Sequence, residues 1–251
     1  MKSITSRTNE TIKHLFSLQQ KKQRTTHNQF LAEGLRACKT LIESKVTLIQ
    51  LFVTEQYSAE SQKIISDEYI TIVSESIMEK ISSASSPSGI IGQFTIPDEP
   101  SADLLSSGLV LAQISDPGNM GTLIRTAAAL NQKSIVIIDG TDPYSPKVVQ
   151  SSAGTIGMVR IFQWSWHELL EYKGAQKLIA LVVSGGKKPS EISVKNALLV
   201  VGSEAHGIPE QWITDCDAQL TLPMPGQAES LNAAVAGSIA LYLWTVSSAQ
   251  M

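Results

Sequence analysis

Three short stretches of this 251-residue chain place polar side chains close to glycines, the residue type that lets backbone approach a ligand closely. The first stretch holds Asn119 and Arg125, the second holds Glu204, and the third holds Ser230 and Asn232. A guanidinium can bind a phosphate or stabilise a developing oxyanion, and carboxylate and amide groups can orient their partners. Each residue also has an ordinary explanation, as a solvated helix arginine, an acid in a first helical turn, or a helix cap. Together, the three stretches predict a ligand site.

Each of these stretches follows an apolar run that predicts a strand buried on both faces of a parallel sheet. The runs are Leu109–Ile114, Ala197–Gly202 and Leu220–Leu222. Further strands are predicted at Ser134–Ile138, Val159–Phe162 and Lys177–Ser184, and helices at Thr122–Leu130, Val148–Ala153 and Pro209–Asp215. Alternation of this kind predicts an α/β domain with a mostly parallel sheet over residues 108–251. The carboxyl ends of its strands should bring the three stretches together.

The N-terminal part of the chain predicts a second, smaller α/β unit over residues 1–96. Helical spacing is present at Thr8–Gln20, Gly34–Lys45, Ala59–Ser66 and Glu75–Ser82, and strand patterns at Ile49–Val53, Tyr69–Val73 and Gly92–Thr95. Residues 97–107 begin with two prolines and three acids within seven residues, a composition that cannot build a core element. We expect this segment to link the two domains.

Composition excludes several classes of protein. Hydrophobic residues make up 43% and charged residues 17% of the chain, as in a soluble globular protein. No apolar run reaches the length of a membrane span, and the N-terminus has no signal-peptide core, so a cytoplasmic location is expected. The two cysteines and four histidines lack metal-ligand spacing, and no metal site is predicted.

Positive charge is concentrated at the N-terminal end of the chain. Residues 1–45 carry nine Lys or Arg against three Glu, although the whole chain has a net charge of −3. The densest part holds Lys21, Lys22 and Arg24, between two helical patterns, where we expect an exposed segment. A charged run is usually a solvated face, but this asymmetry favours an anionic partner.

The motifs resemble those of the SpoU (TrmH) family of S-adenosylmethionine-dependent RNA ribose 2′-O-methyltransferases, in the SPOUT superfamily. The carrying stretches are Asn119 to Arg125, Gly202-Ser-Glu-x-x-Gly207, Leu222-Pro-Met-x-Gly226 and Ser230-Leu-Asn-x-x-x-Ala236. The segment from Pro143 to Gly154 also resembles an intermediate part of the family pattern, and residues 1–96 are similar to its ribosomal-protein-like RNA-binding domain. Ser203 departs from the pattern, since asparagine is common there.

The resemblance implies a trefoil-knotted methyltransferase domain whose loops bind S-adenosylmethionine. The residues implied in cofactor binding are Val183, Ser184, Gly202, Ser203, Gly207, Ile208, Leu222, Met224, Leu231 and Asn232. It also implies an RNA substrate, with rRNA favoured over tRNA, and a homodimer built on the small-residue helices that contain residues 126–129 and 233–237. Lys21, Lys22, Arg24 and Arg125 are the expected RNA contacts.

In the same reading, Arg125 binds the phosphate and assists loss of the ribose proton, while Asn119, Glu204, Ser230 and Asn232 orient the reacting groups. Two other classes remain as alternatives. A non-catalytic RNA-binding protein would not need Arg125, Glu204 and Asn232 together. An ordinary nucleotide-binding enzyme would need a phosphate-binding glycine motif, which the sequence lacks.

Overall fold

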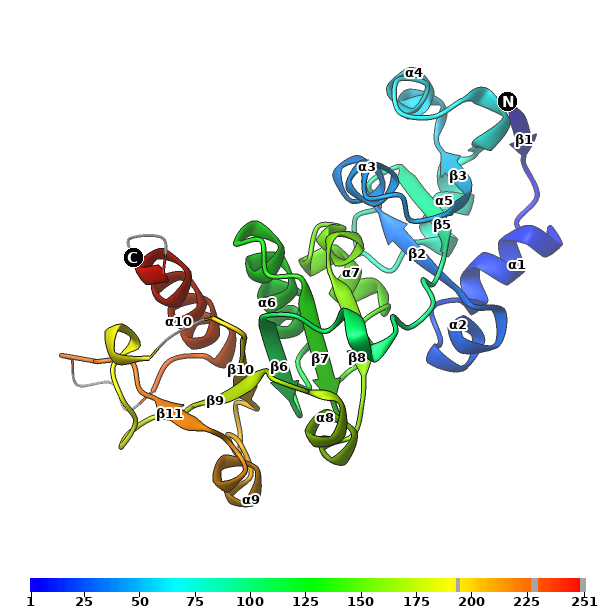
Figure 1. Cartoon of the computed structure of the whole chain (residues 1–251). Coiled ribbons are helices and arrows are strands. Elements are labelled where there is room, and N and C mark those ends of the chain that lie inside the picture. The colour runs from blue at the N-terminus through cyan, green and yellow to red at the C-terminus, as the bar shows by residue number, and fades with distance from the viewer. Residues whose placement is uncertain (193–194, 227–229, 249–251) are drawn as a thin grey trace. The chain divides into compact units, whose positions relative to one another are not determined.

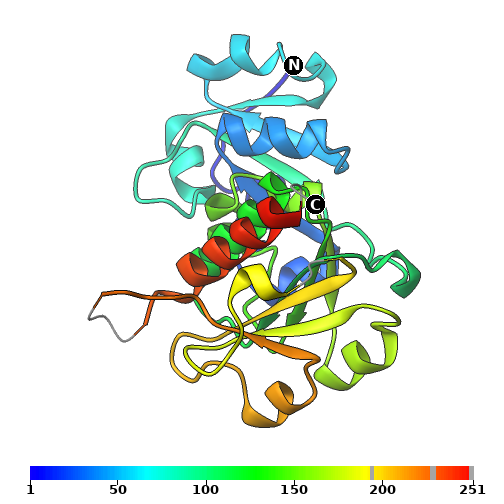
Figure 2. The same ribbon diagram turned by 60° about the vertical axis from the view of Figure 1, so that its left-hand side comes forward.

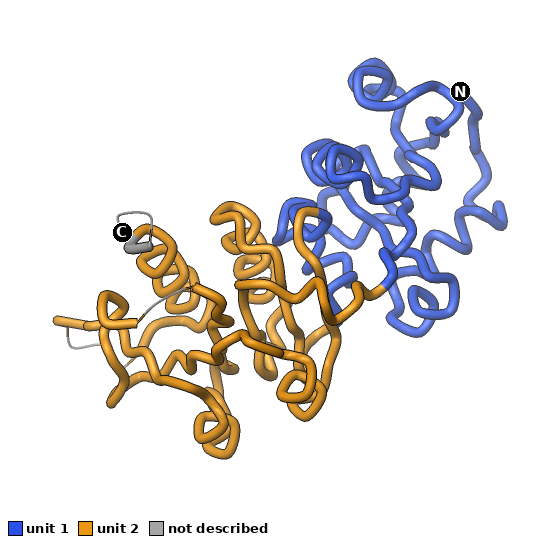
Figure 3. The backbone as a smooth tube through the Cα atoms, viewed as in Figure 1, with its two compact units in different colours: residues 1–98, 142–157 blue, residues 99–141, 158–251 orange. Residues whose placement is uncertain are grey.

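The computed structural model describes residues 1–192, 195–226 and 230–248 of the chain, of which the side chains of 247 and 248 are excepted. These residues form two compact units (Figure 3). Unit 1 comprises residues 1–98 and 142–157, and unit 2 comprises residues 99–141 and 158–251. Figures 1 and 2 show the elements of both units in two views. Each unit is described by itself below.

Unit 1 is built on a five-stranded mixed sheet in the order β1-β4-β3-β5-β2. Its strands are β1 (Lys2–Ile4), β2 (Gln29–Glu33), β3 (Leu48–Val53), β4 (Ile70–Val73) and β5 (Ile90–Thr95). Its helices are α1 (Glu10–Ser17), α2 (Lys21–His27), α3 (Leu35–Glu43), α4 (Ser58–Ser61) and α5 (Glu75–Ile81), with α7 (Pro146–Ser151) from the second segment. Sequence patterns predicted β3, β4, β5 and five of these helices, but they missed β1, β2 and α2.

The sheet of unit 1 has an apolar core on each face. On one face, α1 and α5 bury Ile12, Leu15, Ile77 and their neighbours against Phe52 of β3. On the other face, α3 and α7 contact β2, where Phe30 stacks on Phe94 of β5 with ring centroids 5.6 Å apart. Because side chains alternate along a strand, this two-faced burial leaves little polar alternation in β2, which explains why its pattern was overlooked.

Residues 142–157 lie in unit 1, although the sequence places them between strands of the other unit. Tyr144 contacts Phe30 with ring centroids 5.2 Å apart, and Asp142 pairs with Arg24. A Cβ at Gly154 would meet the backbone of Ala37 at 2.4 Å, so this glycine permits close packing on α3. The predicted division had assigned this whole segment to residues 108–251, and no local pattern distinguishes it.

Unit 2 is built on a six-stranded sheet in the order β11-β9-β10-β6-β7-β8, and every pair in it is parallel. The strands are β6 (Gly108–Ala112), β7 (Ser134–Ile138), β8 (Arg160–Gln163), β9 (Lys177–Leu181), β10 (Ala197–Gly202) and β11 (Ala218–Leu220). The predicted α/β class with a parallel sheet is confirmed. β7 and β10 have the predicted bounds, because their apolar runs are short and end abruptly.

Helices cover both faces of this sheet (Figure 1). On one face lie α6 (Pro117–Ala129) and α10 (Ala233–Ser248), and on the other α8 (Trp166–Tyr172) and α9 (Glu210–Thr214). Trp166 of α8 stacks in parallel on Trp212 of α9, with ring centroids 4.8 Å apart. Trp164 and Trp166 are buried, as expected of core residues.

The helix α6 begins at Pro117, five residues before its predicted start at Thr122. Asp116 is its N-cap, with a carboxylate oxygen accepting a hydrogen bond from the Asn119 N–H at 2.8 Å. An aspartate followed by proline is a favourable N-cap and first position, so the residues just before the predicted start already belong to the helix.

The loop after β9 lies on both sides of β11. The Val182 N–H donates to the Leu220 carbonyl at 2.9 Å, and on the other edge the Lys187 N–H donates to the Gln219 carbonyl at 2.8 Å. The Gly186 N–H donates to the Thr221 hydroxyl at 2.9 Å, which holds the return of the loop. Residues 182–187 therefore bracket the strand that leads to Leu222.

Candidate functional site

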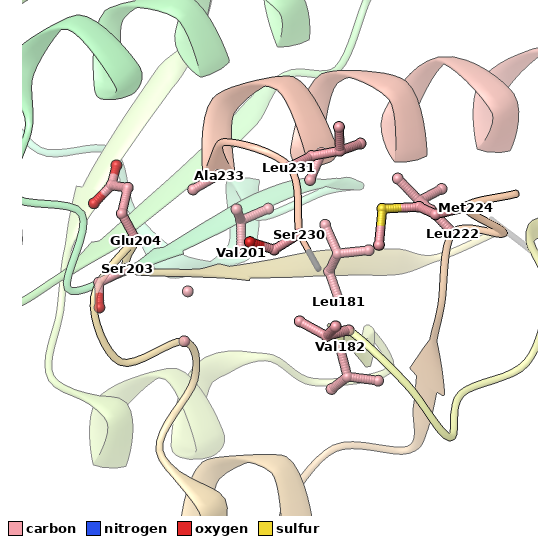
Figure 4. A pocket seen from close by; sticks show the side chains of 14 residues that line it. Leu181, Val182, Val201, Ser203, Glu204, Leu222, Met224, Ser230, Leu231 and Ala233 are labelled. Atoms are coloured by element: carbon pink, nitrogen blue, oxygen red, sulfur yellow. The ribbon is translucent and has the colours of Figure 1, made fainter. Parts of the chain in front are cut away.

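A pocket opens at the carboxyl ends of β9 and β10, and Figure 4 shows the side chains that line it. It encloses about 810 Å³, part of it open to solvent. Ser203 and Glu204 lie at one end, and Leu222 and Met224 at the other (Figure 4). The full lining is Leu181, Val182, Val183, Val201, Gly202, Ser203, Glu204, Gly207, Leu222, Met224, Ser230, Leu231, Ala233 and Ala236. This is the crevice position where α/β sheets usually bind ligands.

The loop after β10 folds back on itself beside the pocket. The Ser203 N–H donates to the Gly207 carbonyl at 3.1 Å, and the Gly207 N–H donates to the Ser203 carbonyl at 2.9 Å. Gly207 has a φ of +66°, which favours glycine, and a Cβ at Gly202 would meet the Gly207 backbone at 2.3 Å. Both glycines are therefore needed for a loop this tight, as their motif spacing suggested.

Side chains from the three predicted stretches meet in one hydrogen-bonded chain. The Asn232 amide donates to the Asn119 carbonyl oxygen at 3.2 Å, and the Asn119 amide donates to the Glu204 carboxylate. Asn232 also caps α10, with its carbonyl oxygen accepting from the N–H groups of Ala234 and Val235 at 2.9 and 3.2 Å. Asn119 and Asn232 thus stand at the N-termini of the two helices that pack together. Asn119 bonds directly to Glu204, and Asn232 is linked to Glu204 through Asn119.

Arg125 lies on an exposed part of α6 and is not among the residues that line the pocket. Because the helix starts at Pro117, this arginine stands more than two turns inside it, about 12 Å along the axis from the first residue. The Glu204 carboxylate accepts from Asn119, and none of the described residues hydrogen-bonds or ion-pairs with the guanidinium of Arg125. The guanidinium is free to contact another molecule.

Of the residues predicted to bind a cofactor, seven line the pocket: Val183, Gly202, Ser203, Gly207, Leu222, Met224 and Leu231. Ser184, Ile208 and Asn232 do not; Ile208 is buried in the core under α8 and α9. The motifs did not predict five apolar lining residues. These are Leu181, Val182 and Val201 on the floor, and Ala233 and Ala236 of α10. Their positions, at strand ends and in a first helical turn, could have indicated that they line the pocket.

The basic stretch at residues 20–27 differs from its prediction, because it forms the helix α2 and not an exposed connection. Lys21 and Lys22 are exposed, but the expected exposure of Arg24 is wrong, since it is 3% exposed. Its Nε donates to the Asp142 carboxylate at 2.9 Å, and its Nη1 donates to the carbonyls of Leu18 and Gln19, both at 2.8 Å. The guanidinium of Arg24 is therefore occupied by hydrogen bonds within unit 1.

The described residues contain no group of three His, Cys, Asp or Glu side chains arranged to hold a metal ion. Burial raises the pKa of the Cys38 thiol to about 12 and that of Cys216 to about 12, so neither has the character of a thiolate ligand. None of the helices among these residues is long and apolar enough to cross a membrane.

Two protein-family models match the sequence. The model of the SpoU rRNA methylase family matches residues 107–242, and the model of an MRM3-like substrate-binding domain matches residues 9–92. The chain is 31% identical to the 23S rRNA (guanosine(2553)-2′-O)-methyltransferase RlmP of Bacillus subtilis, over 96% of this chain and 98% of that protein. It is 26% identical to a 23S rRNA (uridine(2479)-2′-O)-methyltransferase of Streptomyces viridochromogenes, covering 88% and 83% of the two chains.

The fold is also similar to solved structures. One is an rRNA methyltransferase from Sinorhizobium meliloti with S-adenosylmethionine bound, at a TM-score of 0.85 and 26% identity. The similarity covers 97% of each chain, so both units have counterparts there. The resemblance that the motifs suggested is therefore confirmed over the whole length of the chain.

Proposed function

Since the chain belongs to the SpoU rRNA methylase family, we propose that it transfers a methyl group from S-adenosylmethionine to a ribose 2′-hydroxyl of ribosomal RNA. The observation that carries this proposal is the meeting of Asn119, Glu204 and Asn232 beside an apolar pocket at the strand ends. Both similar curated enzymes named above act on 23S rRNA, which favours rRNA over tRNA. We also propose that the protein acts in the cytoplasm.

The pocket fits the cofactor by the chemistry of its lining. Leu181, Val201 and Leu222 offer apolar surfaces suited to an adenine ring, whereas the hydroxyls of Ser203 and Ser230 offer polar contacts at its rim. Glycines and alanines leave room for close approach to backbone. When bound, S-adenosylmethionine supplies an electrophilic methyl group on a sulfonium, so the reaction needs alignment of the acceptor more than a strong base.

The residues around the pocket divide this task. Glu204 holds the Asn119 amide, and Asn119 in turn accepts from Asn232, so three loops keep one mutual arrangement. Such fixed groups can orient the ribose without reorganising during the reaction. Arg125 supplies the positive charge that binds the neighbouring phosphate and stabilises the 2′-oxygen as its proton leaves.

We propose that the active form is a homodimer. The side chains of Val235, Ile239, Tyr242 and Val246 are 39% to 56% exposed and are spaced by three or four residues along α10. They form an apolar stripe of the kind that marks an interface. A two-fold assembly through this stripe could bring Arg125 of one subunit to the pocket of its partner, which would explain why the arginine does not line the pocket of its own chain.

The loop that brackets β11 supports a further proposal, that the chain is knotted as in the SPOUT superfamily. β11 is hydrogen-bonded on one edge to Val182 and on the other to Lys187, as expected of a strand whose chain passes through that loop. Leu222, Met224, Ser230 and Leu231, which follow β11 in the chain, line the pocket. Such threading would explain how loops distant in sequence converge on one ligand.

The test is methylation of purified RNA. Full-length protein is incubated with methyl-labelled S-adenosylmethionine and with unmodified ribosomal RNA or unmodified tRNA, and the digested products are separated by mass spectrometry. We expect one 2′-O-methylated nucleoside from ribosomal RNA and none from tRNA. Base methylation, or labelling of tRNA alone, would contradict the proposal.

A further inference from the structure

One end of the sheet in unit 1 carries three uncharged polar side chains and one lysine where an apolar core would be expected. Paired strand residues point to the same face, and the register pairs Lys2 with Thr71 and Gln50 with Gln93. Phe52, which also pairs with Thr71, joins this face to the core under α1 and α5. We call Lys2, Gln50, Thr71 and Gln93 the polar platform.

The platform lies at the bottom of a hollow that α1 and α5 leave uncovered. This hollow encloses about 920 Å³, part of it open to solvent, and Thr11 of α1 lies at its side. Thr71 and Gln93 are only 3% and 6% exposed, so their polar groups are set deep in unit 1. The lining contains one lysine and neither an aspartate nor a glutamate, a balance that favours an anionic partner such as RNA.

The hydrogen bonds of the platform leave acceptors unused. The Gln50 amide nitrogen donates to the Thr71 hydroxyl at 3.0 Å, and the Gln93 amide nitrogen donates to the Gln29 side-chain oxygen at 2.8 Å. Neither the Gln50 nor the Gln93 side-chain oxygen accepts a hydrogen bond from any residue in the described part of the chain. Both oxygens can therefore accept hydrogen bonds from a ligand that donates.

We propose that the polar platform binds an unpaired nucleotide of the RNA substrate whose base carries an exocyclic amino group. This inference rests on the proposed function and adds to it a site that the substrate-binding domain uses. Amide side chains read the edges of unstacked bases in single-stranded RNA, and the two free oxygens match the amino hydrogens of adenine, cytosine or guanine. Uracil has no amino group and should bind less well. Lys2, exposed at the edge strand β1, can contact the adjacent phosphate.

Binding of short single-stranded RNA to the full-length protein tests the proposal directly. The probes are fluorescein-labelled nonamers of A, C and U, measured by fluorescence anisotropy at one fixed salt concentration. We expect the A and C nonamers to bind more tightly than the U nonamer. Gln50→Met and Gln93→Met, which keep side-chain length but remove the acceptor, should each weaken A and C binding about 3- to 10-fold. Binding of the U nonamer should hardly change.

Gln56→Met is the matched control, because Gln56 is an exposed glutamine of unit 1 outside the hollow. Equal binding of all three nonamers by the wild type would overturn the proposal. So would unchanged A and C binding in the double variant that combines Gln50→Met with Gln93→Met. A thermal melt establishes that each variant is folded. Methyl transfer to ribosomal RNA by the wild type tests the proposed function separately, so the failure of either one is recognised without the other.

Discussion

Arg125 stands on the exposed side of α6, without a partner among the described residues, and its role decides how the reaction is driven. If it serves the RNA and not the cofactor, Arg125→Ala should leave S-adenosylmethionine affinity near wild type. Methyl transfer should fall about 10²-fold or more, the usual result of removing one preorganised charge-stabilising donor. Calorimetry of cofactor binding and single-turnover methylation measure the two quantities.

Arg125→Lys should recover little activity, because an ammonium group cannot make the planar two-pronged contact to phosphate. Arg160→Ala, which removes an exposed arginine of β8, is the control. If Arg125→Ala loses cofactor binding but transfers methyl normally at saturating cofactor, Arg125 serves the cofactor and not the RNA.

Asn232 has two separable roles, since one of its amide atoms caps α10 and the other bonds to Asn119. Asn232→Ala should lower the free energy of unfolding by about 1 kcal/mol through loss of the cap, and should also lower cofactor affinity and methyl transfer. Asn232→Ser keeps a capping oxygen but cannot donate to Asn119. We expect it to restore stability in chemical denaturation without restoring transfer. Equal recovery of both quantities would argue that the residue acts only as a cap.

At the scale of the element, α2 separates two kinds of basic residue that the sequence had grouped. Lys21→Glu with Lys22→Glu should weaken RNA binding and flatten its salt dependence, because exposed cations release counterions from RNA. Stability should stay within about 0.5 kcal/mol of wild type, as is usual for surface changes. Filter binding at several salt concentrations provides the measurement. Unchanged RNA affinity would mean that α2 is only a solvated helix.

Arg24→Met should behave in the opposite way. The substitution leaves Asp142 largely buried without its cation and should destabilise the protein by about 3–5 kcal/mol. Adding Asp142→Ala to Arg24→Met should recover part of that loss, because the unpaired carboxylate is then removed as well. Denaturant unfolding of the two variants measures both effects; an unaltered midpoint in Arg24→Met would show that the buried pair contributes little.

The helix α10 shows how far sequence reasoning reached. Its small residues were expected at a dimer interface, but within the chain they pack against α6, where the hydroxyls of Thr126 and Ser238 lie 2.9 Å apart. A Cβ on Gly237 would meet the Leu123 side chain at 2.7 Å, so the glycine lets the two helices approach closely. The apolar stripe on the other side of α10 went unnoticed, because a helix without charged residues has no strongly polar face to reveal it.

Other elements were missed for physical reasons of their own. Local periodicity cannot reveal β2, since both its faces are buried, nor α2, since its stability comes from Arg24 and its partners. Within the site, motif spacing identified Asn119, Glu204 and Asn232, whose meeting depends on loops at strand ends. The apolar pocket floor carries no motif, because any apolar strand end would serve.

At the scale of the whole molecule, the proposed homodimer can be tested by a substitution in α10. Ile239→Glu places a charge in the apolar stripe and should yield a monomer in light scattering at micromolar concentration, with methyl transfer lost. Its thermal unfolding should hardly change, because Ile239 is 40% exposed in the single chain. Leu104→Glu, at a residue 44% exposed and outside α10, is the control. A wild-type protein that is monomeric and active would contradict the dimer.

The contribution of residues 142–157 to unit 1 has a consequence for the order in which the protein is made. A ribosome completes residues 1–98 first, but Asp142, which pairs with Arg24, and Tyr144, which contacts Phe30, lie 44 or more residues further on, in a segment that ends at residue 157. At about 5–20 residues per second, the nascent chain waits roughly 3–12 s for the remaining 59 residues. During this interval the face of β2 that α7 later covers is open to the chaperones that attend the exit tunnel.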